Sequence, residues 1–253
     1  MSATVSTPPA RFRLRHLDPL LLIVMALLLW EAVSTWTQGI AITGPATTFA
    51  YTAELMLTGR FWDNAGATLG AFATAFILSA AIGLLLGLVL GLWRFAGDVA
   101  EPVLAGFYTI PKVTLYPVVL LLFGLGAGAK IAFGVMHGMI PVTLFTVAAI
   151  RNLPPVLPRA ARALRLSPAQ TIRWVLVPAC LPQIVAGLRL GFSLSLLGVL
   201  IGEMFSSQRG LGFLLISGLA QNNVRLSTAI VLVIVVFAIL ANTAMLRLSR
   251  RMG

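Results

Sequence analysis

The sequence predicts an all-α polytopic membrane protein with six transmembrane helices. Of its 253 residues, 59% are hydrophobic and only 10% are charged, whereas a soluble domain has about half apolar and about a quarter charged residues. Each membrane helix needs roughly 20 apolar residues, so a chain of this length has room for about six with their loops. This composition disfavours a soluble globular domain and excludes a disordered chain.

Six apolar stretches fit this number. The first follows a basic start and resembles a signal peptide, but it continues to Trp36 without a clear cleavage site, so we interpret it as an uncleaved span. The mixed segment after it is expected to hold a short surface helix. Residues 1–16 are predicted to form a tail and residues 17–250 the membrane domain. The predicted spans are 20–36, 65–93, one within 103–125, one within 131–150, 188–205 and 227–246.

The basic residues predict the orientation. Loops on the cytoplasmic side of a membrane are usually enriched in lysine and arginine. With six crossings, both termini share a side with the loop 151–178. That side carries twelve basic residues, and the other side carries four: Arg60, Lys130, Arg209 and Arg225. Both termini and this loop are therefore predicted to be cytoplasmic. The net charge of +11 is scattered between apolar segments, so it does not indicate nucleic-acid binding.

Three glycines in the second span are spaced four residues apart. Gly83, Gly87 and Gly91 therefore lie on one face of the helix. Small residues at this spacing let a neighbouring membrane helix approach closely. We predict a packing face, with lipid-facing filler as the alternative.

Several catalytic motifs are missing from the sequence. Lys130 lies near glycines but lacks the adjoining glycine and hydroxyl of a phosphate-binding loop. One cysteine and two histidines are too few for a metal or catalytic cluster, so no metal site is expected. If nucleotide drives this protein, another chain must bind it.

The loop 151–178 predicts a docking site. Its first half is rich in alanine and arginine and favours a helix, while Ser167 can cap a second short helix with Pro168 at its first position. Pro178 and Pro182 are expected to break that helix before the fifth span. We predict a helix–turn–helix that contacts a partner, with a solvated basic loop as the alternative. The predicted contact residues are Ala160, Ala161, Arg165, Leu166, Ser167, Gln170, Thr171, Val177 and Pro178.

This loop resembles the EAA loop of binding-protein-dependent ABC transporter permeases. That pattern has Glu-Ala-Ala, then a glycine, then a hydrophobic residue followed by proline. In this chain the two alanines are Ala160-Ala161, Arg165 stands at the glycine position, and the final pair is Val177-Pro178. Arg159 replaces the glutamate. The flanks resemble the sulfonate, nitrate and taurine branch through Trp30-Glu31, Ile110-Pro111-Lys112, Tyr116-Pro117, Phe123-Gly124-Leu125-Gly126, Gly187-Leu188-Arg189, Gly202-Glu203-Met204 and Gly210-Leu211-Gly212.

The resemblance implies a MetI-like permease fold and the permease subunit of an ABC importer. It implies a homodimer in a bacterial inner membrane, two ATPase subunits that hold ATP and magnesium, and an extracytoplasmic solute-binding protein. It also implies a small, anionic solute and a chain that binds no cofactor itself. The two arginine replacements predict either a different turn or a strained left-handed Arg165, and a more acidic ATPase surface.

Four ionisable or polar residues are candidates for the translocation pathway: Lys112, Tyr116, His137 and Glu203. A charge inside the membrane is kept where it faces a cavity, a partner or the interface. Lys112 either lines the pathway, where its ammonium would suit an anionic solute, or extends to the membrane interface. His137 is either a packed polar residue or a ligand-binding residue. Glu203 either pairs with Arg209 or helps to close an outer gate.

Three alternative functions remain open from the sequence. A gradient-driven secondary transporter would need inverted repeats and mid-membrane carboxylates, a membrane enzyme would need a nucleophile or metal cluster, and a scaffold would need neither.

Overall fold

The computed structural model describes residues 18–252, which lie outside the predicted tail 1–16, and within this range every regular element is helical. A 3-10 turn at Lys112–Leu115 precedes α5 and a π-helical turn at Ile172–Leu176 precedes α9. The helices are α1 (Asp18–Trp36), α2 (Pro45–Met56), α3 (Gly59–Leu92), α4 (Arg94–Thr109), α5 (Tyr116–Phe123), α6 (Ala127–Arg151), α7 (Val156–Ala163), α8 (Pro168–Thr171), α9 (Val177–Ser206), α10 (Leu211–Ala220) and α11 (Val224–Met252).

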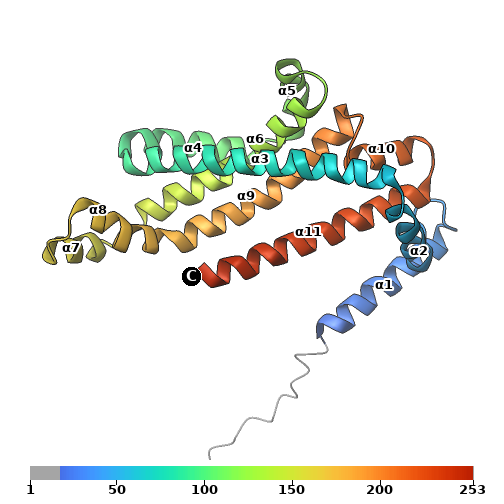
Figure 1. Ribbon diagram of the computed structural model, residues 1–253, viewed down its shortest axis with the longest axis horizontal. Helices are drawn as coiled ribbons and strands as arrows, with labels where there is room; N and C mark the ends of the chain where they lie inside the picture. Colours follow the sequence, from blue (N-terminus) through green and yellow to red (C-terminus); the bar gives the residue numbers. More distant parts are fainter. Residues whose placement is uncertain (1–17, 253) are drawn as a thin grey trace, which may run out of the picture.

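The core is built around α6, which packs along both α3 and α9 (Figure 1). Phe133, Ile140 and Val142 of α6 are at most 1% exposed. In contrast, 11% of the most apolar 18-residue stretch of α11 is buried inside the protein, whereas 56% of the corresponding stretch of α6 is buried. An apolar helix that is mostly unburied in the protein is suited to contact with lipid, whereas α6 makes the protein interior.

Glycines bring α3 and α6 into close contact. A Cβ at Gly83 would lie 2.7 Å from Cβ of Val142. At Gly87 a Cβ would overlap Thr146, and at Gly91 it would lie 2.7 Å from Cδ1 of Ile150. The face predicted for helix packing therefore lies directly against α6, because only a hydrogen atom fits at these positions.

The number of spans differs from the six that the sequence predicts. Among residues 21–247, four helices are long and apolar enough to cross a membrane: α3, α6, the helix Pro168–Ser206 and the Val224–Arg247 part of α11. A fifth span results if α4 and the 112–123 segment count as one, although they bend by 94° at the break. The apolar part of α1, Leu21–Trp36, is shorter. The six-span count is therefore not confirmed.

The predicted proline break before the fifth span is wrong. Helical structure continues from Pro168 to Ser206 over 39 residues, through Pro178 and Pro182. Proline lacks an N–H and clashes with the carbonyl four residues before it. The π-helical turn Ile172–Leu176 ends two residues before Pro178 and bonds i to i+5 in place of i to i+4, and Pro182 is accommodated within α9.

Candidate functional site

The loop predicted to contact a partner forms two short helices with a tight turn between them. α7 ends in a Schellman motif, in which the Leu166 N–H donates to the Ala161 carbonyl and the Arg165 N–H donates to the Arg162 carbonyl, both at 3.0 Å. Arg165 has a φ of +53°. The arginine thus keeps the left-handed backbone of the glycine it replaces in the EAA pattern, at a cost of roughly 1–2 kcal/mol.

A capping box starts α8 on the other side of this turn. The Ser167 hydroxyl accepts a hydrogen bond from the Gln170 N–H at 3.3 Å, and the Gln170 side-chain oxygen accepts one from the Ser167 N–H at 2.9 Å. These two bonds satisfy donors that the first turn of a helix otherwise leaves free. Hydrogen bonds therefore fix the backbone on both sides of Arg165.

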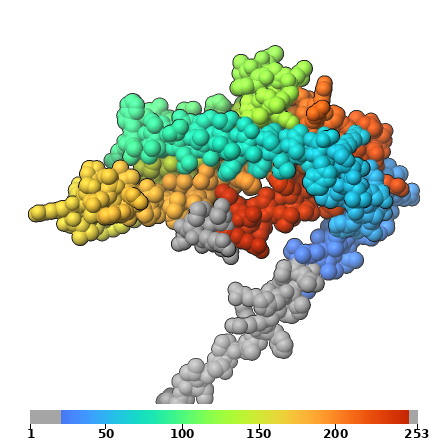
Figure 2. Space-filling model, in the orientation of Figure 1, coloured from blue at the N-terminus to red at the C-terminus, as the bar shows by residue number. Residues whose placement is uncertain are grey.

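The surface of this helix–turn–helix is basic and apolar, and it projects from one end of the body (Figure 2). Leu164 and Trp174 are 72% and 60% exposed. The exposed arginines are Arg159, Arg162, Arg165 and Arg173. None of the four has an ion-pair partner among residues 21–247, whose side chains the structure describes. Of the other predicted contact residues, Ala161 is buried, Leu166, Gln170 and Thr171 are half-buried, and Ala160, Ser167, Val177 and Pro178 are exposed.

Lys112 lies in the break between α4 and α5 and is 9% exposed. Its ammonium donates to the Tyr108 carbonyl at 3.3 Å and lies 5.0 Å from the centre of the Tyr108 ring. No carboxylate in the described part of the chain pairs with it. An ammonium has three donors, so this cation keeps unused capacity for an anion.

Tyr116 and His137 each contact Phe133 edge to face, so the three rings form one aromatic cluster. The ring of Phe133 lies 4.9 Å from Tyr116 and 4.5 Å from His137, centre to centre. His137 Nδ1 lies 2.9 Å from the Phe133 carbonyl, so Nδ1 carries the proton. The Tyr116 hydroxyl donates to the Gly202 carbonyl at 3.0 Å and also bonds to the Ser206 hydroxyl. Both residues therefore have packing roles in this structure.

Glu203 forms an ion pair with Lys130 rather than with the Arg209 side chain. Lys130 Nζ lies 3.0 Å from Glu203 Oε1, and the two side chains are 6% and 0% exposed. Arg209 contributes its carbonyl oxygen, which accepts from Lys130 Nζ at 3.2 Å. The other carboxylate oxygen of Glu203 accepts from the Thr68 hydroxyl at 2.8 Å and from the Gly212 N–H at 3.1 Å.

The partners of Glu203 are the residues that sequence analysis missed. Lys130 is 73 positions away along the chain and was assigned to a loop. Thr68 looks like an ordinary small polar residue of the predicted span 65–93, and Asn64, which bonds to the Gly210 N–H near Glu203, lies just before that span. The sequence indicates only that a carboxylate within an apolar segment, such as Glu203, requires a nearby cation. It does not indicate which cation this is.

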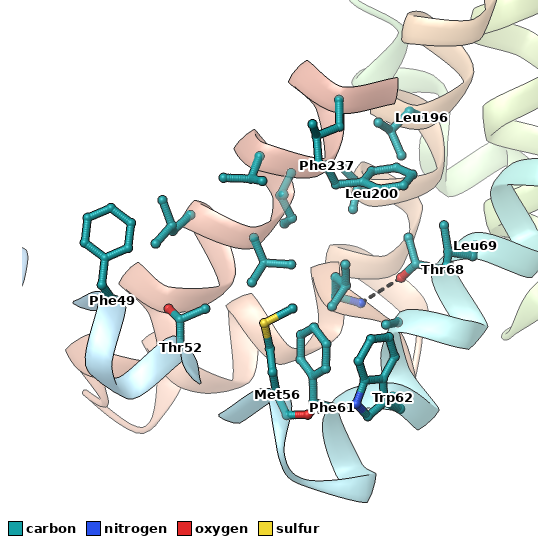
Figure 3. A pocket seen from close by; sticks show the side chains of 17 residues that line it. Phe49, Thr52, Met56, Phe61, Trp62, Thr68, Leu69, Leu196, Leu200 and Phe237 are labelled. Carbon is teal, nitrogen blue, oxygen red and sulfur yellow. Dashed lines mark hydrogen bonds between the residues drawn. The ribbon is translucent and has the colours of Figure 1, made fainter. Parts of the chain in front are cut away.

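An apolar cavity of about 350 Å³ lies beside this network, between α2, α3, α9, α10 and α11 (Figure 3). Thr68 stands at its edge, where its hydroxyl accepts a hydrogen bond from the Leu211 N–H at 2.8 Å. Within the described residues, no three His, Cys, Asp or Glu side chains gather closely enough to hold a metal ion.

Comparisons with known proteins give one consistent answer. Residues 79–253 match the family described as binding-protein-dependent transport system inner membrane component. The chain is 27% identical over 213 residues to the putative aliphatic sulfonates transport permease protein SsuC of Bacillus subtilis, covering 83% of this chain and 77% of SsuC. It is 32% identical over 190 residues to the riboflavin transport system permease protein RibX of Chloroflexus aurantiacus, covering 71% and 70%.

The fold is similar to that of a solved transporter chain. A chain from inward-facing conformations of the MetNI methionine ABC transporter superposes with a TM-score of 0.59 at 21% identity, covering 74% of this chain and 93% of that one. At this identity the likeness describes the fold alone.

Proposed function

The chain belongs to the family of binding-protein-dependent transport system inner membrane components, and we propose that it is the subunit through which an ABC importer moves a small anionic solute inward. The family and the MetI-like helical fold agree with the resemblance seen in the EAA loop. The proposal adds the energy source, the partners, the orientation and the solute.

The observation that carries the proposal is the fixed helix–turn–helix of α7 and α8. Its exposed arginines have no partner in the described residues, and Leu164 and Trp174 leave apolar surface beside them. A surface with aromatic and arginine side chains is typical of protein interfaces. We assign it to an ATPase subunit, two copies of which would bind ATP and magnesium and move this surface as a rigid body.

The remaining partners follow from the family name. A binding protein would deliver solute on the side opposite to α7 and α8, and two copies of this chain would enclose the pathway in a bacterial inner membrane. Both termini would then be cytoplasmic, as the distribution of arginines predicts. The fold places α7 and α8 at the end of the body opposite to α10 (Figure 1), which suits contacts on two different sides.

The assignment of an anionic solute is supported by Lys112 and by the similarity to the sulfonate permease SsuC. Lys112 is a cation in a broken helix without a pairing carboxylate among the side chains of residues 21–247. Broken helices often line transport pathways. The riboflavin transport system permease RibX is also similar to this chain, so a larger organic solute is the alternative that the transport test must separate.

The docking role is tested by acidic substitutions on the helix–turn–helix. We expect the double variant Leu166→Asp/Thr171→Asp, in lipid nanodiscs, to bind the cognate ATPase subunit at least about tenfold more weakly, because a carboxylate would be forced into the interface. Leu57→Asp is the control, since Leu57 is 88% exposed and lies in the connection after α2. Unchanged binding and uptake in the double variant would count against the docking role.

The acidic character of the ATPase surface is tested at Arg165. Arg165→Ala removes the charge but keeps the backbone strain, whereas Arg165→Gly removes both. If charge drives docking, both variants weaken ATPase binding several-fold, and the weakening fades as salt rises. Equal affinity of wild type and both variants would exclude an acidic contact at this position.

The solute and the energy source are tested by uptake into proteoliposomes that contain the ATPase and the binding protein. Lys112→Met should reduce uptake of a small alkanesulfonate about tenfold, and Lys112→Arg should restore part of it. Preferential uptake of riboflavin would overturn the anionic assignment. Uptake without ATPase that collapses with an ionophore would support a gradient-driven transporter instead.

A further inference from the structure

We propose that Asn64, Thr68, Lys130 and Glu203, together called the α10 anchor, are positioning residues for transport. In this proposal they fix α10 to α3, α6 and α9, so that α10 moves only as part of this body and never opens as a separate lid. The role in transport rests on the proposed function, whereas the fixing of α10 is a property of the chain alone.

The first argument concerns the start of α10. The first N–H groups of a helix have no partner within the helix, and Gly210 before α10 has no side chain to cap them. Here Asn64 Oδ1 accepts from the Gly210 N–H at 2.8 Å, Thr68 accepts from the Leu211 N–H at 2.8 Å, and Glu203 accepts from the Gly212 N–H at 3.1 Å. The caps come from α3 and α9, so α10 cannot move away without losing all three.

The second argument concerns charge. One oxygen of Glu203 bonds to α10 and Thr68, and the other bonds to Lys130 of α6. The carboxylate also lies at the positive end of the α10 dipole. Lys130 in turn holds the Arg209 carbonyl just before α10. Moving α10 away would leave two buried charges with fewer partners, which is strongly unfavourable.

The third argument is steric. Gly210 has a φ of +130°, and a Cβ there would overlap the Glu203 carboxylate. A Cβ at Gly202 would lie 2.8 Å from the Lys130 Cα, and one at Gly212 would lie 2.5 Å from the Leu200 carbonyl oxygen. The start of α10 therefore fits without free space against α9, and α9 fits equally closely against α6 at the same level.

A second short helix is held at the same place. The Tyr116 hydroxyl of α5 donates to the carbonyl of Gly202, the residue before Glu203. The short helices α5 and α10 are thus both attached around residues 202–212 of the chain. A change at Glu203 should therefore affect the placement of the elements near the predicted pathway without touching α7 and α8 at the other end (Figure 1).

The test compares Glu203→Gln, Lys130→Met and the double variant. Each single change leaves one buried charge unpaired, and the double variant is neutral again. Two readouts are needed: hydrogen exchange of the 210–213 amides in the chain alone in nanodiscs, and uptake per folded transporter after addition of the ATPase and binding protein. Glu203→Asp replaces Glu203→Gln if the latter does not fold, because it keeps the charge with a shorter reach.

We expect both single variants to speed exchange of these amides about tenfold or more, with unchanged exchange in α7 and unchanged ATPase binding. Uptake per folded transporter should fall about tenfold, and the double variant should recover most of both. Unchanged exchange in a folded single variant would overturn the fixing of α10. Faster exchange with full uptake would overturn its role in transport. Failure of the wild type to bind the ATPase would instead count against the proposed function and leave the exchange result valid.

Discussion

The two ends of α6 hold charged residues in opposite surroundings. Near its start, Lys130 pairs with Glu203 at 3.0 Å, with side chains 6% and 0% exposed. At its end, Arg151 pairs with Asp98 at 2.7 Å and with Glu101 at 3.4 Å, where the two carboxylate side chains are 69% and 56% exposed. The shorter contact is the weaker one, because water screens the Asp98 pair and nothing but protein surrounds Glu203. Distance alone therefore does not rank these pairs.

The Arg151 end is held by close fit instead of charge. The Arg151 guanidinium also donates to the carbonyls of Leu90 and Arg94 at 3.4 and 2.9 Å. A Cβ at Gly97 would overlap both this guanidinium and the Leu90 carbonyl. The turn between α3 and α4 thus closes around Arg151, which donates to the Leu90 carbonyl that the end of α3 leaves free and to the Arg94 carbonyl at the start of α4.

The largest effect is expected at the buried end. Lys130→Met should lower the free energy of unfolding by about 3–5 kcal/mol, because Glu203 would stay buried without its cation. Reversible unfolding in detergent micelles measures this, and Lys130→Met/Glu203→Gln is the neutral control. A loss below about 1 kcal/mol in the single variant would mean that the pair behaves like a surface pair.

A smaller effect is expected from the close fit at the other end. Gly97→Ala should cost about 1–3 kcal/mol, because the added methyl group displaces Arg151 or the Leu90 carbonyl. Gly106→Ala is the matched control on α4, since a Cβ there meets nothing within 4 Å. The same unfolding measurement compares the two. Equal stabilities would show that the turn yields without cost and that fit is unimportant there.

The smallest effect is expected from the exposed charges. Asp98→Asn and Glu101→Gln should each change the free energy of unfolding by less than about 1 kcal/mol, and the change should shrink further at high salt. If Asp98→Asn instead cost as much as Lys130→Met, exposure would not explain the difference between the two ends of α6.

The main membrane helices were predictable from the sequence, but their breaks and pairings were not. Long apolar runs fixed the positions of α3, α6, α9 and α11, because burial in lipid depends on composition over about 20 residues. The 94° break after α4 and the short helix α10 lie in segments whose composition resembles that of a span. Hydropathy averages over a window and does not detect such local geometry.

The candidate sites show the same division. The capping box at Ser167 is local, and the spacing to Gln170 indicates it directly. Sequence analysis left two conformations open for Arg165, and the structure has the left-handed one. The pair of Lys130 and Glu203 depends on how α6 crosses α9, so no spacing rule could have joined the two residues.

The unbroken helix from Pro168 to Ser206 has a mechanical consequence. Its 39 residues make a rod roughly 58 Å long at 1.5 Å per residue. The rod lies against α6 over many turns: a Cβ would lie 2.5 Å from Phe145 Cβ at Gly187, 2.8 Å from the Phe133 carbonyl oxygen at Gly198, and 2.8 Å from Lys130 Cα at Gly202. A displacement of the Pro168 tip would therefore move α9 and α6 together and reach Glu203, about 52 Å away along the rod, without tilting one helix against the other.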